Sequence, residues 1–161
     1  MKDSSMELFK DLVRTLGMGE IISKVRLANE YDVILHEEGR LPKKKIRSVE
    51  VIGIIDTGAV MTLLPQDLVE KLGLRKIDTE IVTLANDQKV ELARAGTLSL
   101  TMADREMKMD CLVGPPRCEV LIGQLVLERL DLIVDPRRQT VSPRPESPFL
   151  PMHNLKAAIH R

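Results

Sequence analysis

The stretch "GIIDTGAVMTLLP", residues 53–65, places a single carboxylate between an apolar run and a Gly-containing turn. Asp56 is the group here that can take up or release a proton. Thr57 can form a hydrogen bond with its surroundings, and Gly58 permits a positive φ or a close approach of another segment. Because a carboxylate at the end of a buried strand costs free energy unless it is paired or used, the stretch predicts a rigid turn that presents Asp56 above an apolar floor.

A second apolar strand is "EVLIG", residues 119–123, and a short helical pattern, "QLVLERL", follows it. Gly123 has no evident local role in this pattern unless another chain segment crosses close to it. Asp131 and Asp135 come next, in "LDLIVDP", but no Thr-Gly or Ser-Gly turn follows either of them. Neither repeats the motif at Asp56.

Composition indicates one globular domain with some tail. The 161 residues are 43% hydrophobic and 30% charged, which suits a chain that buries a real core. Lys+Arg and Asp+Glu are both 24, so no global field attracts nucleic acid or an anionic membrane. Aromatic residues are only 2%, which argues against a base-stacking surface and predicts a core of Val, Ile, Leu and Met. The basic run "KKKIR" at 43–47 is interpreted as a solvated loop.

Two further features bear on compartment and metals. No apolar run approaches the roughly 20 residues of a membrane helix, and the charged start "MKDSSMELFKDLV" does not resemble a signal peptide. We therefore expect a cytoplasmic protein without membrane contact. Cys111 and Cys118 make no disulfide framework and have no Cys or His at ligand spacing nearby. They are interpreted as reduced packing residues, and no metal or other cofactor is expected.

Short β-branched runs broken by Gly, Asn, Asp and Pro dominate the rest of the chain and predict a mostly β domain, a sandwich or a partly closed barrel. "ANDQ" (85–88) and "DREM" (104–107) look like hairpin tips. Besides an amphipathic N-terminal pattern, only two helices are expected. The predicted strand regions are 45–56, 79–114 and 119–123, and the predicted helices are 4–16, 64–74 and 124–130.

The expected organisation has three parts. Residues 1–18 form an N-terminal helical arm, which packs on its own domain or reaches a partner subunit. Residues 19–143 form the domain. Residues 144–161 form a Pro-rich tail, whose segment "SPRPESPFLP" predicts an extended, poorly packed linker or a proline motif for another protein.

Together, "IIDTGA", "TLLP", "CLVGPPRCEVLIG" and "QLVLERL" resemble the retropepsin-like aspartic proteases, single-domain relatives of pepsin that include the retroviral proteases. The resemblance runs from about Glu20 to Pro143 and is closest to the microbial branch. It implies the retropepsin-like acid-protease fold, a closed or partly open barrel of short strands with one or two short helices, here preceded by the N-terminal helix. It also implies that Asp56 is catalytic, with Thr57 and Gly58 completing the motif.

The mechanism that this resemblance implies needs two carboxylates that share one proton around a water molecule. The chain has one Asp-Thr-Gly, and no other aspartate fits the motif: Asp78, Asp87, Asp104, Asp110, Asp131 and Asp135 all lack the turn. The second carboxylate is therefore expected from Asp56 of a second copy, in a homodimer whose two-fold axis passes through the active site. The implied substrate is a peptide or protein.

By position, the hairpin that contains "TLANDQKV" is the flap over the cleft, with Ala85, Asn86, Asp87 and Gln88 near its tip and Leu84 near the flap as a further wall residue. The residues expected to form the substrate-binding wall are Ala59, Val60, Leu121 and Ile122. The alternatives are an ordinary solvated hairpin and simple core packing.

Several positions depart from the relatives. The flap has no Gly, and Val60 and Gln124 stand where retroviral members have an Asp–Arg ion pair. Ala59 has no hydroxyl to stabilise the charged catalytic carboxylate, which predicts an activity optimum nearer neutrality than that of pepsin.

The function that follows is an aspartic endopeptidase. The alternative is a weakly active or inactive domain of the same fold that serves binding or assembly, in which Asp56 only holds its turn.

Overall fold

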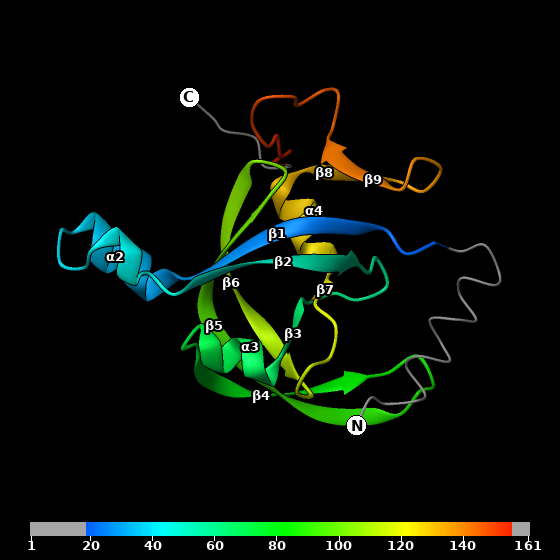
Figure 1. The fold of residues 1–161 in the computed structure, drawn as a ribbon. Coiled ribbons are helices and arrows are strands. Elements are labelled where there is room, and N and C mark those ends of the chain that lie inside the picture. Colours follow the sequence, from blue (N-terminus) through cyan, green and yellow to red (C-terminus); the bar gives the residue numbers. More distant parts are fainter. Residues whose placement is uncertain (1–18, 156–161) are drawn as a thin grey trace.

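The computed structural model describes residues 19–155, which form a β-barrel with short helices on its outside (Figure 1). The expected helix at 4–16 lies outside the described residues. In chain order the elements are β1 (Ile22–Asn29), α2 (Glu30–Glu37), the 3₁₀ helix η1 (Lys43–Lys45), β2 (Ser48–Ile55), β3 (Leu63–Pro65), α3 (Gln66–Lys71), β4 (Arg75–Thr83), β5 (Lys89–Met102), β6 (Arg105–Gly114), β7 (Leu121–Ile122), α4 (Gln124–Leu130), β8 (Leu132–Asp135) and β9 (Thr140–Pro143).

The main sheet closes on itself. Its seven strands follow the order β1-β2-β7-β3-β6-β5-β4, and β1 also pairs with β5, so β4 is left as an edge strand attached to β5. Most neighbours are antiparallel, but β2 pairs with β7, and β3 with β6, in parallel. Parallel neighbours cannot be joined by a tight hairpin, so the chain must cross between them. The expectation of a mostly β retropepsin-like fold is confirmed.

Aliphatic side chains fill the barrel, as the composition predicts. Along β1, Val25 and Leu27 point inward, opposite Val51 and Val49 of β2, because side chains alternate between the two faces of a strand. The largest fully buried apolar side chains are Leu27, Leu64, Leu72, Leu98, Leu100, Met102, Ile122, Leu130, Val25, Val126 and Cys111. No aromatic ring belongs to this core within residues 19–155.

The two helices predicted after β3 and β7 are present. Pro65 precedes α3, and Gly73, with φ 64°, follows its end, so the helix stops where a left-handed residue is available. α4 buries Val126, Leu127 and Leu130 against the barrel. Both predicted hairpin tips also form, between β4 and β5 and between β5 and β6. No helix within residues 19–155 is long and apolar enough to cross a membrane.

Helix α2, which projects from one side of the barrel (cyan in Figure 1), was not expected. Its one buried residue is Asp32, so it carries no apolar stripe from which a helix could be predicted. Two long-range interactions stabilise it instead. The Asn29 side chain accepts a hydrogen bond from Asp32 N and donates one to Leu72 O, and Arg47 forms a bidentate pair with Asp32 at 2.8 and 2.9 Å.

The segment after β9, expected to be a poorly packed linker, exposes large apolar side chains such as Phe149 (90%) and Leu150 (76%), but hydrogen bonds tie residues 144–152 to the end of α4. Asp131, left-handed at the end of α4, accepts hydrogen bonds from Arg144 Nε (2.5 Å), Ser147 Oγ (2.5 Å) and Met152 N (2.9 Å). The buried guanidinium of Arg105 donates to the carbonyl oxygens of Leu130, Asp131 and Ser147. The segment turns at residues 145–146, where Ser147 N donates to Arg144 O (3.0 Å), and this polar network fastens it to α4.

This network predicts an acid-sensitive contribution to stability. Hydrogen bonds from Arg144, then Ser147 and Met152, hold the pKa of Asp131 well below its usual range. Because the pKa is lower in the folded protein than in the unfolded chain, the stabilisation is complete above about pH 4 and declines as the pH falls further. We expect Asp131→Asn, which tolerates the left-handed backbone, to lower the melting temperature at neutral pH and to flatten its decline below about pH 4. Thermal unfolding between neutral and acidic pH measures both effects.

The control is Asp104→Asn, the same change at an exposed, left-handed residue of the β5–β6 turn (φ 59°). An unchanged acid dependence in Asp131→Asn would contradict this account of the network.

Candidate active site

Asp56 occupies a tight turn immediately after β2. Its backbone N–H donates to Ile122 O (3.0 Å), and its carbonyl accepts from Ala59 N (3.2 Å). The Gly58 N–H donates to Asp56 Oδ1 at 3.0 Å, which orients the carboxylate. Asp56 is half-buried, whereas Thr57 and Gly58 are exposed. The predicted rigid turn is therefore present, and it presents its carboxylate at the surface of the barrel.

A crossing of two chain segments holds this turn in place. The backbone N–H groups of Gln124 and Leu125, at the start of α4, donate to Ala59 O (2.7 Å) and Val60 O (3.1 Å). The buried Thr62 accepts a hydrogen bond from Gly123 N through Oγ1 (3.3 Å). A Cβ at Gly123 would lie 2.6 Å from the backbone of the crossing segment. The role of Gly123 is therefore to allow the close crossing of another chain segment, which the sequence alone could suggest but not locate.

Val60 and Gln124 belong to this crossing. Backbone hydrogen bonds therefore join the two segments at the place where retroviral relatives are expected to have an ion pair.

Beside Asp56 lies a cleft of about 650 Å³ between the turn and the β4–β5 hairpin. Six of the residues proposed from the sequence line it together with Asp56: Gly58, Ala59, Val60, Leu84, Ala85 and Leu121. Asn86 and Asp87 do not line it. They form the exposed tip, where Asp87 is left-handed (φ 62°) and Gln88 N donates to Asn86 Oδ1 (3.1 Å).

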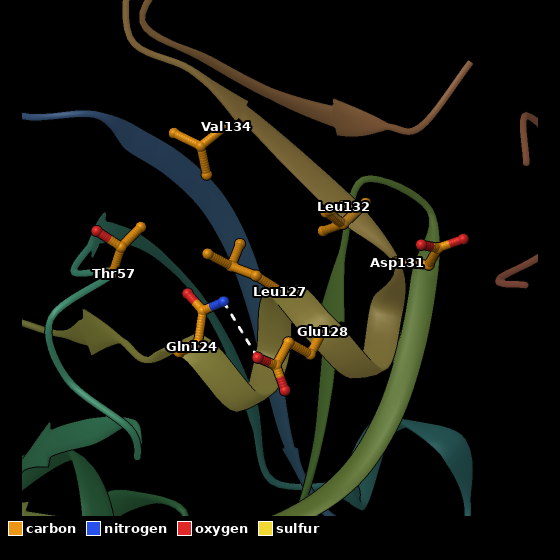
Figure 2. A pocket seen from close by; sticks show the side chains of 7 residues that line it. All are labelled: Thr57, Gln124, Leu127, Glu128, Asp131, Leu132 and Val134. Atoms are coloured by element: carbon orange, nitrogen blue, oxygen red, sulfur yellow. Dashed lines mark hydrogen bonds between the residues drawn. The ribbon is translucent and has the colours of Figure 1, made fainter. Parts of the chain in front are cut away.

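Ile122 is wrong as a wall residue because its side chain is fully buried in the core. Thr57 lies outside the cleft as well. It lines a shallower hollow of about 430 Å³ against α4 and β8, together with Gln124, Leu127 and Val134 (Figure 2). Gln124 Nε2 donates to Glu128 Oε1 in that hollow (3.3 Å), the dashed line in the figure. Thr57 and Asp56 therefore face two different depressions on either side of the turn.

The sequence interpretation missed a larger part of the cleft wall. The additional lining residues are Met61, Leu63, Glu80, Ile81, Val82, Thr83, Leu92 and Leu112. Alternation along β4 could have indicated only the half-buried pair Glu80 and Val82, whereas the exposed Ile81 and Thr83 border the cleft as well. Apart from Asp56, Glu80 and Thr83, the side chains that line the cleft are apolar, and no cation is among its described lining residues.

The two cysteines lie apart from this cleft. Cys111 belongs to the barrel core, and its burial raises the pKa of the thiol to about 12. Cys118 is half-buried beside Gly114, and burial also raises its pKa. Both fit the interpretation as packing residues. Within the described part of the chain, no group of three or more His, Cys, Asp or Glu side chains is placed to hold a metal ion.

A comparison with known families gives one match. The family described as "gag-polyprotein putative aspartyl protease" matches residues 43–129, which is more than half of the chain. The matched region begins before β2 and includes Asp56, the β4–β5 hairpin, Gly123 and most of α4. No curated protein sequence matches the chain significantly.

The crossing at Gly123 yields a prediction about stability. Gly123→Ala places a methyl group against the backbone of Val60 and Met61, which cannot move without breaking the hydrogen bonds around the Asp56 turn. We expect a loss of about 1–3 kcal/mol in the free energy of unfolding, the usual range for overpacking. Urea unfolding measures it.

Gly58→Ala is the matched control for stability, because a Cβ there meets only Asp56 Oδ1, at 3.3 Å. Its expected loss is under about 1 kcal/mol. Equal losses of unfolding free energy in the two variants would show that the close backbone contact at Gly123 does not limit stability.

Proposed function

The chain belongs to the gag-polyprotein aspartyl protease family, and from this premise we propose that it is an endopeptidase whose active site is completed by a homodimer. Each subunit supplies one Asp56 carboxylate. The observation that carries the proposal is the position of Asp56, which is oriented by Gly58 N at 3.0 Å and lines an apolar cleft large enough for peptide side chains.

One chain provides one suitable carboxylate. The other carboxylate in the cleft, Glu80, lies on β4 within 3.5 Å of Arg94 Nε and is not part of the Asp56 turn. A two-fold axis close to Asp56 would bring two identical carboxylates together, because an isologous interface pairs each residue near its axis with its own copy.

The chemistry of such a pair is hydrolysis by proton transfer. Two close carboxylates cannot both ionise easily, so the pair holds one proton and titrates as a unit. The ionised member takes a proton from water while the water oxygen bonds to the peptide carbonyl carbon, and the protonated member donates to the carbonyl oxygen. Transfer of a proton to the amide nitrogen then lets the C–N bond break, which releases a carboxylic acid and an amine.

The surface around Asp56 supports a dimer. Thr57 and Gly58 are exposed there, and so are two large apolar side chains of the crossing, Val60 (65% exposed) and Leu125 (47% exposed). Exposed apolar side chains grouped in this way favour a protein contact. The face that carries the catalytic turn is therefore a suitable place for a second copy.

The β4–β5 hairpin is suited to cover the substrate. Its tip is closed by hydrogen bonds from Leu84 N to Gln88 O (2.8 Å) and from Asp87 N to Leu84 O (2.9 Å). Below the tip, Leu84 and Val82 belong to the cleft lining. A hairpin of this kind can exclude water and hold the peptide backbone when it closes.

The proposal is tested with Asp56→Asn on a mixed peptide library, with cleavage read by mass spectrometry. We expect at least about a 100-fold loss of activity, because the amide cannot act as an acid or a base. Asp104→Asn, the same change in the β5–β6 turn, should cleave like the wild type.

Equal cleavage by the wild type and Asp56→Asn would sink the proposal. A wild type that binds peptides without cutting them would instead support the alternative, a binding or assembly domain of the same fold.

A further inference from the structure

Glu80 is the charged side chain of the cleft that the proposed hydrolysis does not use. It lies on β4, three residues before the end of that strand, and faces the same side as Val82. Glu80 and Val82 are half-buried, whereas Ile81 between them borders the cleft but is 69% exposed. Glu80 therefore stands within the wall of the cleft that also holds Asp56.

Arg94, the cation next to Glu80, already forms ion pairs with two other carboxylates. Arg94 donates to both oxygens of Asp78, through Nε (2.7 Å) and Nη2 (2.5 Å), and to Asp110 through Nη1 (2.5 Å). These pairs raise the pKa of Arg94 and lower that of Asp78. The Glu80 carboxylate lies 3.5 Å from Arg94 Nε, which is a charge contact rather than a short hydrogen bond.

Negative charge is therefore in excess at this end of the cleft. Three carboxylates, those of Asp78, Glu80 and Asp110, surround the one guanidinium of Arg94. Lys76 also acts on Asp78 through its charge, which still leaves one carboxylate uncompensated. The Glu80 side chain is 41% exposed, so a bound molecule can reach it.

We propose that Glu80 selects a lysine or arginine side chain in the bound peptide. The aliphatic stem of either residue would pack on the apolar wall beside Val82 and Leu92, while its charged end reaches the Glu80 carboxylate. This inference deepens the proposed function and rests on it, because it assigns a substrate class to the same cleft: peptides with apolar residues at the scissile bond and a basic residue further along. In a two-fold dimer the preference occurs at corresponding positions on both sides of the cut.

The test begins with the same peptide library, which identifies the positions where basic residues are enriched among cleaved sequences. A matched peptide pair then carries lysine or norleucine at such a position, so that the charge changes while the stem is kept. We expect wild-type kcat/KM to be about two- to fivefold higher for the lysine peptide, the range for a partly exposed ion pair. Glu80→Gln should remove the preference.

Glu91→Gln is the matched control. Glu91 is exposed on the neighbouring strand β5 and is not among the residues that line the cleft. This variant should keep the lysine preference. The salt dependence gives a test that needs no variant. Raising the salt concentration from about 0.05 to 0.5 M should weaken the wild-type preference for lysine, because salt screens the partly exposed ion pair between lysine and Glu80.

The outcomes separate this inference from the proposed function. Cleavage without a lysine preference, or a preference that survives in Glu80→Gln, overturns the role of Glu80 and leaves the protease intact. If the wild type cuts no peptide, the proposed function fails. The role of Glu80 is then decided by binding measurements with fluorescently labelled peptide pairs that carry lysine or norleucine at successive positions. Tighter lysine binding that disappears in Glu80→Gln supports it, whereas equal binding or no binding overturns it.

Discussion

The backbone crossing between residues 59–62 and 122–125 is the constraint on which the rest of the structure depends. Two amide groups at the start of α4 donate to the carbonyl oxygens of Ala59 and Val60, and Asp56 N donates to Ile122 O. These bonds require the two backbones to touch, which is possible because Gly123 has no side chain. The crossing fixes the loop that carries the Asp56 carboxylate. It also lets the two-residue strand β7 lie between β2 and β3 in the sheet. The cleft, the turn and the exposed face beside it all depend on this contact.

The parts of the fold that the sequence predicts are those with local signals. Helix α3 follows Pro65, the hairpin tips have turn residues, and the Asp56 turn has its Thr-Gly. Helix α2 and the attachment of segment 144–152 could not be found in this way, because both depend on buried carboxylates that accept hydrogen bonds from residues distant in sequence. Ile122 shows a different limit: Leu121 lines the cleft, whereas the side chain of Ile122 is buried in the core, in line with the alternation of side chains along a strand. The sequence carried that signal, but β7 is too short for a pattern to reveal it.

The proposed dimer would explain why one aspartate in each chain is enough. Two copies brought together repel when both are charged, so one proton is retained, and an acid and a base are available at the same pH. One subunit provides the Asp56 turn, the apolar wall of the cleft and the β4–β5 hairpin. The two-fold axis would place two identical groups together, and the single proton that they share would make one an acid and the other a base.

The most direct measurement of this shared site is a subunit-mixing experiment. Wild type and a tenfold excess of Asp56→Asn protein are unfolded together and refolded, and cleavage is measured per wild-type subunit. If each active site needs an Asp56 from both subunits, random pairing leaves about one tenth of the wild-type subunits in active pairs, and activity per wild-type subunit falls to about that fraction. Activity that stays constant per wild-type subunit would show that one chain cleaves alone, and would contradict the shared carboxylate pair.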